Sequence, residues 1–295
     1  MELGCGLFGL ASELEQDSEQ TLKQLAESGF TAVEPIYAFR NDPALAPDSP
    51  VPSFVRTLLW DEQKVRMMLP KLNEWGLAIS SMHIGLSADI KEDDALPELI
   101  SFSKKTGIRF FMTSLEFDTL EKCRAAARQL DYANQILNPH GIHLGYHNHY
   151  MEFKKVIADG RECTLMEDFL EHTSDKVMLQ LDVGWQLFGG DDVISFMEKY
   201  SSRIFSVHLK DFVADFASVD EKDSFAAVGD GVLPTEKILN QIPNLPLIPH
   251  GLMIDQDRAA KGQVLLSDLK KGSDYLRTII LALNQADRNL IGLDN

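Results

Sequence analysis

Histidine and carboxylate side chains recur where short apolar runs of this sequence end. Residues in these positions are Glu34, His83, the His147-Asn148-His149 triplet, Asp182, His208 with Lys210 and Asp211, and Asp255 with Asp257. Imidazole nitrogens and carboxylate oxygens that converge on one place form a site suited to Mn²⁺, Mg²⁺, Co²⁺ or Zn²⁺. The pattern predicts one bound divalent metal ion, provided that the fold brings the ends of the runs together.

Each of these residues also has a purely structural interpretation. Asp182, before Val-Gly-Trp, could simply begin a turn, Glu34 could be a cap or a structural ion-pair partner, and His83 could be a satisfied core histidine. Alternation along Ser-Val-His-Leu-Lys places Lys210 on the same side of its run as His208. A histidine and a lysine on one side favour a functional site over a core histidine.

The elements that must position these residues form a regular series. Short β-type runs alternate with amphipathic stretches, which is typical of βα units around a parallel sheet. A final helix around Leu265–Leu283 and the even spacing favour a closed (β/α)₈ TIM barrel of the α/β class, whose strands all end at one mouth. The eight runs are Leu3–Gly9, Phe30–Ile36, Leu77–Ile84, Arg109–Ser114, Ile142–Asn148, Val177–Val183, Ile204–Asp211 and Leu247–Asp255.

Local signals predict where some helices begin and how the chain is divided. Asp118-Thr-Leu-Glu121 has the pattern of a capping box, and Asp17-Ser-Glu-Gln20 predicts the start of a helix that ends at a left-handed Gly29. The proline-rich stretch at about 40–53 predicts a loop inserted after the second strand. We expect residues 1–295 to form a single domain.

Two local patterns predict no site. Gly4-Cys-Gly-Leu-Phe-Gly9 has the letters of a dinucleotide-binding loop, but only three residues precede it, too few for the strand that such a loop requires. The three cysteines are far apart and form no close quartet with histidines, which argues against a structural zinc site.

The amino-acid composition limits the kinds of partner that the protein can bind. Twenty-eight Lys and Arg face 45 Asp and Glu, for a net charge of −17, and no basic cluster is present that could hold nucleic acid or an anionic membrane surface. No apolar run is long enough to span a membrane, and Glu2 stands where a signal peptide needs basic charge. With its unpaired cysteines, the sequence predicts a cytoplasmic protein.

Five segments in order along the chain carry a family resemblance. They are Gly145–Phe153 (GYHNHYMEF), Leu181–Trp185 (LDVGW), Ser206–Asp211 (SVHLKD), Val228–Val232 (VGDGV) and Met253–Asp257 (MIDQD). The sequence resembles the sugar phosphate isomerase/epimerase family of the xylose isomerase-like barrel superfamily. The resemblance implies a (β/α)₈ barrel with one divalent metal ion at its mouth, bound by Asp182, His208 and Asp255 together with a residue that ends strand five.

The sequence departs from the superfamily pattern at three positions. Strand five usually ends in a glutamate ligand, whereas here His147 takes that position and Glu152 is the rival. Asp255 stands where glutamate is common, and its shorter side chain weakens the second role of that position as a base. Asp230 replaces the glutamate of a Gly-Glu-Gly loop that we expect beside the substrate.

Such a site implies proton transfer next to a carbonyl through an enediolate, as in a sugar isomerase or epimerase. We expect Glu152 and Asp255 to act as acid and base, His149 to polarise or shuttle a proton, and Lys210 to contact a hydroxyl or oxyanion. The substrate is then a small sugar or sugar derivative, bound by Glu34, His83, Trp185 and Asp257.

Several alternatives stay open. A lyase or dehydratase acting on a keto-sugar or inosose could use the same site, and a sugar-binding barrel could have lost catalysis. A metal-dependent apurinic-site endonuclease on the same barrel would need a basic track for DNA, which the net charge disfavours. The sequence does not decide whether the chain forms a homo-oligomer, and the absence of a phosphate-binding loop gives no support for a phosphorylated sugar.

Overall fold

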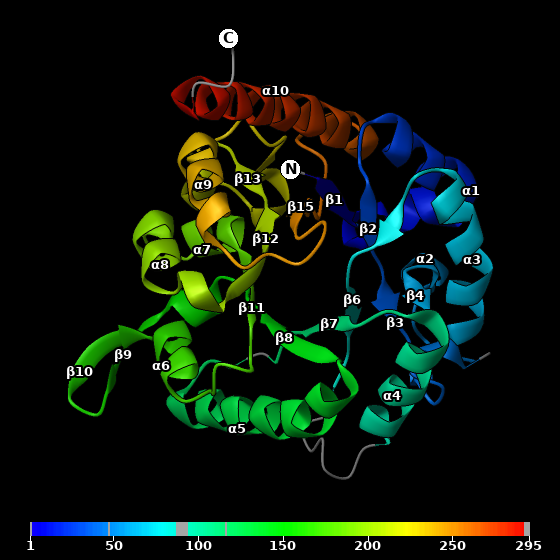
Figure 1. Cartoon of the computed structure of the whole chain (residues 1–295), viewed down its shortest axis with the longest axis horizontal. Coiled ribbons are helices and arrows are strands. Elements are labelled where there is room, and N and C mark those ends of the chain that lie inside the picture. The colour runs from blue at the N-terminus through cyan, green and yellow to red at the C-terminus, as the bar shows by residue number, and fades with distance from the viewer. Residues whose placement is uncertain (1, 47, 87–93, 116, 292–295) are drawn as a thin grey trace.

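The predicted α/β TIM barrel is confirmed in a computed structural model. The structure describes residues 2–46, 48–86, 94–115 and 117–291, with backbone alone at 43 and 284–291. A single curled sheet of 11 strand segments forms its centre, and its neighbouring segments are parallel throughout (Figure 1). In sheet order these are β4 (Leu59–Trp60), β3 (Ile36–Tyr37), β6 (Met82–Ile84), β7 (Phe110–Thr113), β8 (His143–His147), β11 (Leu179–Asp182), β12 (Ile204–Leu209), β15 (Leu252–Ile254), β1 (Leu3–Gly6), β2 (Ala32–Glu34) and β5 (Ala78–Ile79).

The barrel closes through two interrupted strands. Pro35, which has no N–H to donate, separates β2 from β3, and Ser80 and Ser81 separate β5 from β6. Because β2 pairs with β1 and β5 while β3 pairs with β6, these halves join the two ends of the sheet. With the short β4 as an addition, the sheet contains the eight predicted strands, several of them shorter than predicted.

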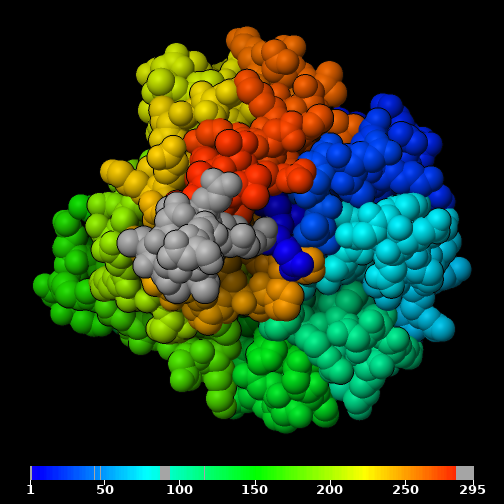
Figure 2. Space-filling view, turned by 45° about the horizontal axis from the view of Figure 1, so that its top comes forward, coloured from blue at the N-terminus to red at the C-terminus, as the bar shows by residue number. Residues whose placement is uncertain are grey.

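Helices surround the sheet (Figure 1). In Figure 2, α10 at the C-terminal end lies beside the N-terminal part of the chain, and α10 packs against α1. The helices are α1 (Ala11–Glu27), α2 (Ser53–Thr57), α3 (Glu62–Glu74), α4 (Ala95–Thr106), α5 (Leu120–Leu137), α6 (Leu165–Glu171), α7 (Val183–Phe188), α8 (Val193–Lys199), α9 (Thr235–Gln241) and α10 (Leu265–Ile291).

One predicted helix cap needs correction, and the predicted start at Asp17 is found inside a longer helix. The cap of α5 is Thr119, whose side chain accepts from the Lys122 N–H at 3.3 Å, whereas Asp118 forms an ion pair with Lys122 Nζ at 2.8 Å. The first helix begins at Ala11, before the predicted start, and is interrupted at Asp17, where φ is −158°. The carboxylate of Asp17 accepts from the Gln20 N–H at 2.9 Å and so caps the segment that follows, as the sequence predicted.

Smaller elements extend the barrel. A hairpin of β9 (Lys155–Ala158) and β10 (Arg161–Thr164) projects from it, and β13 (Asp211–Phe212) pairs with β14 (Phe225–Ala226). The proline-rich stretch contains a short 3₁₀ turn at Pro43–Leu45, and residue 47 within it lies outside the described residues. Within the described part of the chain, no helix is both long and apolar enough to cross a membrane.

Candidate metal centre

Four adjacent strands bring one side chain each to a common point at the barrel mouth. His147 ends β8, Asp182 ends β11, His208 lies in β12, and Asp255 follows β15 directly. One ligand atom from each lies within 4.8 Å of the others, and the residues are 4%, 0%, 1% and 7% exposed. The structure therefore brings together the four residues that the sequence suggested as metal ligands.

Asp182 uses its two carboxylate oxygens differently. Oδ1 accepts from the Trp185 N–H at 2.8 Å and so caps α7. Oδ2 is buried and forms no hydrogen bond within the described residues, although Lys210 Nζ lies 3.4 Å away. Burial raises the pKa of Asp182 to about 6, against the opposing effect of Lys210. A buried carboxylate oxygen without a hydrogen bond fits a site for a cation.

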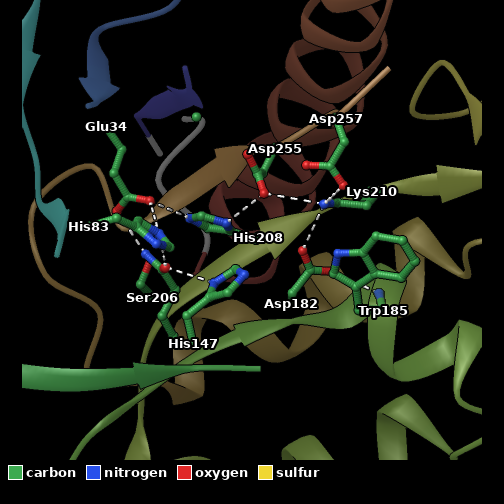
Figure 3. Close-up of polar contacts among 12 residues, drawn as sticks. Glu34, His83, His147, Asp182, Trp185, Ser206, His208, Lys210, Asp255 and Asp257 are labelled. Atoms are coloured by element: carbon green, nitrogen blue, oxygen red, sulfur yellow. Dashed lines mark hydrogen bonds and ion pairs between the residues drawn. The ribbon is translucent and has the colours of Figure 1, made fainter. Parts of the chain in front are cut away.

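Lys210 is a fully buried cation among three carboxylates. Its Nζ lies 3.3 Å from Asp255 Oδ2 and 2.5 Å from Asp257 Oδ2, in addition to its contact with Asp182 (Figure 3). The ammonium also lies 4.8 Å from the centre of the Trp185 ring. Burial alone would lower the pKa of Lys210, but the carboxylates outweigh burial and raise it above its ordinary value, so that this lysine stays charged.

His208 lies between two carboxylates. Its Nε2 is 3.2 Å from Glu34 Oε1, and its Nδ1 is 3.4 Å from Asp255 Oδ2. Burial lowers the pKa of His208, yet Glu34 and Asp255 outweigh it and raise the pKa to about 10. The two carboxylates thus favour the protonated, positively charged form of His208.

Behind the cluster lies a buried hydrogen-bond network rooted in Glu34. Glu34 Oε1 is 2.8 Å from His83 Nε2, and Oε2 accepts from the hydroxyl of Ser81 and, at 2.8 Å, from Gln180 Nε2. Burial would raise the pKa of Glu34, but the imidazoles of His83 and His208 outweigh burial and lower it well below its ordinary value. Glu34 is therefore an ionised carboxylate that orients its neighbours.

His83 belongs to this network more closely than to the metal cluster. One of its nitrogens also lies within 4.8 Å of ligand atoms of His147 and His208. However, its Nε2 already contacts Glu34 Oε1 and, at 3.0 Å, Gln180 Oε1.

Sequence reasoning missed Gln180, Ser206 and Ser81, because single polar residues inside apolar runs look like ordinary strand residues. A usable signal was present, since Gln180 and Ser206 each stand two residues before a proposed ligand and therefore on the same side of the strand.

A cavity of about 420 Å³ opens above the cluster. His149, for which the sequence suggested proton transfer, lines it, as do Trp185 and Asp257, for which the sequence suggested contact with substrate. The walls also include Ser114, Phe8, Ile36, Phe225, Glu221 and Arg258, besides Glu34, His83, His147, Lys210 and Asp255. The mixture of apolar walls and convergent polar groups is typical of a small-molecule site.

Two other residues near the mouth have structural contacts. Glu152 is fully buried and does not line this cavity, and its Oε1 accepts from the Tyr146 hydroxyl at 2.6 Å. The carboxylate of Asp211 accepts from the backbone N–H groups of Gly229, Gly231 and Leu233 at 2.8–3.1 Å. Asp211 thus fixes the loop that the sequence placed beside the substrate, and the loop glycines do not line the cavity.

Gly6 explains part of the glycine pattern near the N-terminus. A Cβ atom at this position would lie 2.2 Å from Asp255 Oδ1. Gly6 therefore leaves room for Asp255 against β1.

A closed parallel barrel whose strand ends gather histidines and carboxylates defines a class of α/β barrels with a candidate metal site at the mouth. A family model for the xylose isomerase-like TIM barrel matches residues 22–247. The chain belongs to this family, which confirms the resemblance seen in the sequence.

Individual relatives show the range of proteins that this chain is similar to. An inosose dehydratase of Bacillus cereus is 28% identical over 137 residues, which are 43% of this chain and only 44% of that relative. A sugar phosphate isomerase/epimerase of Parabacteroides distasonis superposes with a TM-score of 0.70 at 24% identity, over 93% of this chain and 92% of that chain. The zinc-bound IOLI protein superposes with a TM-score of 0.60 at 12% identity, over 96% and 97%. At these identities the structural matches show the fold alone.

Proposed function

We propose that this protein is a divalent-metal-dependent sugar isomerase or epimerase that transfers a proton next to a carbonyl group. The observation that carries the proposal is the buried cluster of His147, Asp182, His208 and Asp255, of which His147 and Asp255 line the cavity. A divalent cation held there would polarise a substrate carbonyl and stabilise the negative charge that develops when the neighbouring carbon loses its proton.

The donor set supports His147 rather than Glu152 as the ligand from strand five. His147 contributes one of the closely spaced ligand atoms. Glu152 contributes none of them, and its Oε1 accepts a hydrogen bond from the Tyr146 hydroxyl. Two imidazoles and two carboxylates form a mixed nitrogen and oxygen site, which suits Zn²⁺, Mn²⁺ or Co²⁺ and also accommodates Mg²⁺. The IOLI protein, which shares the fold, was solved with a bound zinc atom.

Acid and base groups are available on well-separated parts of the cavity wall. His149 follows β8, and its Nδ1 is buried without a hydrogen bond in the described part of the chain. Asp257 follows β15, and β11 and β12 stand between these two strands in the sheet. Burial raises the pKa of Asp257 despite the neighbouring Lys210. We assign proton transfer to His149 and Asp257, and contact with a substrate hydroxyl or oxyanion to Lys210.

The charges at the cavity favour an uncharged substrate. Lys210 already contacts three carboxylates, and the carboxylates on the wall outnumber its cationic side chains. A phosphate group would meet this negative surface, whereas hydroxyl groups can donate to carboxylates and accept from imidazoles. The proposed substrate class is a neutral keto- or aldo-sugar or a cyclic polyol ketone.

A second candidate reaction is dehydration at the same site. The identity with inosose dehydratases specifically favours it, although the match covers less than half of their length. The early chemistry is shared, because loss of the proton next to the carbonyl precedes either return of a proton or expulsion of a β-hydroxyl group. The third alternative, a sugar-binding barrel without catalysis, predicts metal and sugar binding with no exchange of carbon-bound hydrogen.

Proton exchange with solvent separates these alternatives. Metal-free protein is loaded with Mn²⁺, Co²⁺ or Mg²⁺ and incubated in D₂O with free sugars, keto-glycosides and inososes, and proton NMR follows the carbon next to the carbonyl. The proposal predicts deuterium incorporation that chelation abolishes, with a sugar isomer as product. Loss of water from the product would indicate the dehydratase, and binding without exchange across the panel would favour the sugar-binding barrel.

A further inference from the structure

Gln180 occupies the centre of the hydrogen-bond network behind the candidate metal centre. Its side chain is completely buried, and it comes from β11 two residues before Asp182. Oε1 lies 2.9 Å from His147 Nδ1 and 3.0 Å from His83 Nε2, while Nε2 donates to Glu34 Oε2 at 2.8 Å. A contact of 3.3 Å with Ser206 Oγ completes its surroundings.

The neighbours of Gln180 determine which way its amide points. Glu34 Oε2 accepts from the Ser81 hydroxyl and lies 2.8 Å from the Gln180 amide, so the NH₂ group of the amide faces this acceptor. The opposite orientation would place the amide oxygen against a carboxylate oxygen and bury two acceptors in contact. The amide oxygen therefore faces the histidines, and each ring nitrogen that contacts it must be the one that carries the proton.

We propose that Gln180 is a positioning residue that fixes His147 in the tautomer with the proton on Nδ1. The Nε2 lone pair of His147 is then the one available to a cation at the cluster with Asp182 and Asp255. The part of this inference that concerns metal affinity rests on the proposed function, whereas the tautomer itself does not.

The same network orients the second histidine of the cluster through Glu34. His208 Nε2 faces Glu34 Oε1, so Nδ1 is the nitrogen turned towards Asp255 (Figure 3). Glu34 thus holds one proposed ligand directly and the other through Gln180. Hydrogen bonds to the outer nitrogen of a ligating histidine fix its orientation, and losing such a partner typically lowers metal affinity by about 10–100-fold.

The test measures the tautomer in the metal-free protein and the affinity for Mn²⁺ and Zn²⁺ separately. Long-range ¹H–¹⁵N spectra of protein with labelled histidine show which ring nitrogen carries the proton, and a His147→Gln spectrum assigns the signals. Gln180→Met removes the amide while keeping the length of the side chain. Gln186→Met is the matched control, because Gln186 is an equally buried glutamine whose Nε2 donates to Asp191 Oδ2 at 2.8 Å.

We expect wild-type His147 to show the Nδ1–H tautomer alone. Gln180→Met should populate the Nε2–H tautomer and lower metal affinity by about 10–100-fold, whereas Gln186→Met should change neither. An Nε2–H tautomer in the wild type would overturn the inference even if Gln180→Met failed to fold, as would an unchanged tautomer in a folded Gln180→Met. A wild type that shows the expected tautomer but binds no divalent metal would refute the proposed function and leave the role of Gln180 intact.

Discussion

Asp182 illustrates how one side chain combines a structural and a chemical task. Oδ1 caps α7 through the Trp185 N–H, while Oδ2 points to the cluster without a hydrogen bond in the described structure. An asparagine can still cap a helix, but it supplies no negative charge to a cation. The two tasks can therefore be separated by mutation.

We predict that Asp182→Asn loses divalent metal but keeps the cap, whereas Asp182→Ala loses both. In the metal-free state, Asp182→Ala should be less stable than Asp182→Asn by about 1 kcal/mol, the usual value of an N-cap. Urea denaturation and metal analysis of both variants measure the two effects. Metal affinity at the wild-type level in Asp182→Asn would show that this carboxylate is not a ligand.

The pKa of His208 gives a second prediction at this scale. The pKa of His208 in the folded protein is about 10, above the ordinary histidine value of 6.5. The resulting stabilisation of the metal-free fold is therefore complete below about pH 6.5 and is lost as the pH rises through about 10. Near pH 8, His208 holds a proton and Asp182, with a pKa of about 6, does not. Metal binding should then release about one proton, because a ligating imidazole must be neutral.

Titration calorimetry in buffers with different ionisation enthalpies counts the released protons. A His208→Asn variant should bind metal weakly and release none from this position. Binding by the wild type without proton release near pH 8 would mean that His208 is neutral before binding, contrary to the charges around it.

The positive charge of Lys210 compensates for the negative charge of the buried carboxylates in the metal-free site. Removing one partner of a buried ion pair typically costs about 3–5 kcal/mol, because the other charge stays buried alone. We predict that Lys210→Met destabilises the metal-free protein by this amount and that saturating Mn²⁺ restores part of the loss, as measured by denaturant unfolding.

Lys199→Met is the control for this prediction. Lys199 pairs with Glu167 at 2.6 Å, but its side chain is 51% exposed, so its loss should cost about 1 kcal/mol or less. Equal effects of the two substitutions would contradict the description of Lys210 as the internal counter-ion of the cluster.

At the scale of the elements, close approach between β1 and the end of β15 positions Asp255. We predict that Gly6→Ala lowers metal affinity while the protein stays folded, since the added methyl group would lie 2.2 Å from Asp255 Oδ1. Gly85→Ala, at a glycine of the same cavity with no atom within 4 Å of the added Cβ, should bind metal normally. Titration of both variants with Mn²⁺ and circular dichroism measure this, and equal affinities would refute the role of Gly6.

The sequence predicted which strands and helices form better than it predicted the residues at which they begin and end. Apolar runs alternating with amphipathic stretches located all eight strands, because burial on both faces leaves a strong pattern. The capping residue of α5 was harder to predict, because Asp118 and Thr119 are both good helix caps and only packing decides between them. The ligand cluster was predictable because strand ends meet at one mouth, but Gln180 was not, because its role depends on contacts across the barrel with Glu34 and His147.

Across the whole molecule, the candidate centre joins four consecutive strands of the barrel, β8, β11, β12 and β15. The net charge of −17 fits a small uncharged substrate better than nucleic acid. The organisation of residues 1–295 as one domain stays a prediction.

Metal binding by purified protein tests the central claim most directly. Elemental analysis and equilibrium titration with Mn²⁺ and Zn²⁺ should find one divalent ion per chain in the wild type and in Glu152→Gln. Binding should be strongly reduced in His147→Ala, His208→Ala and Asp255→Ala, with circular dichroism unchanged. A wild-type protein that binds no divalent ion, or retention of the ion in folded His147→Ala together with its loss in Glu152→Gln, would contradict the proposed centre.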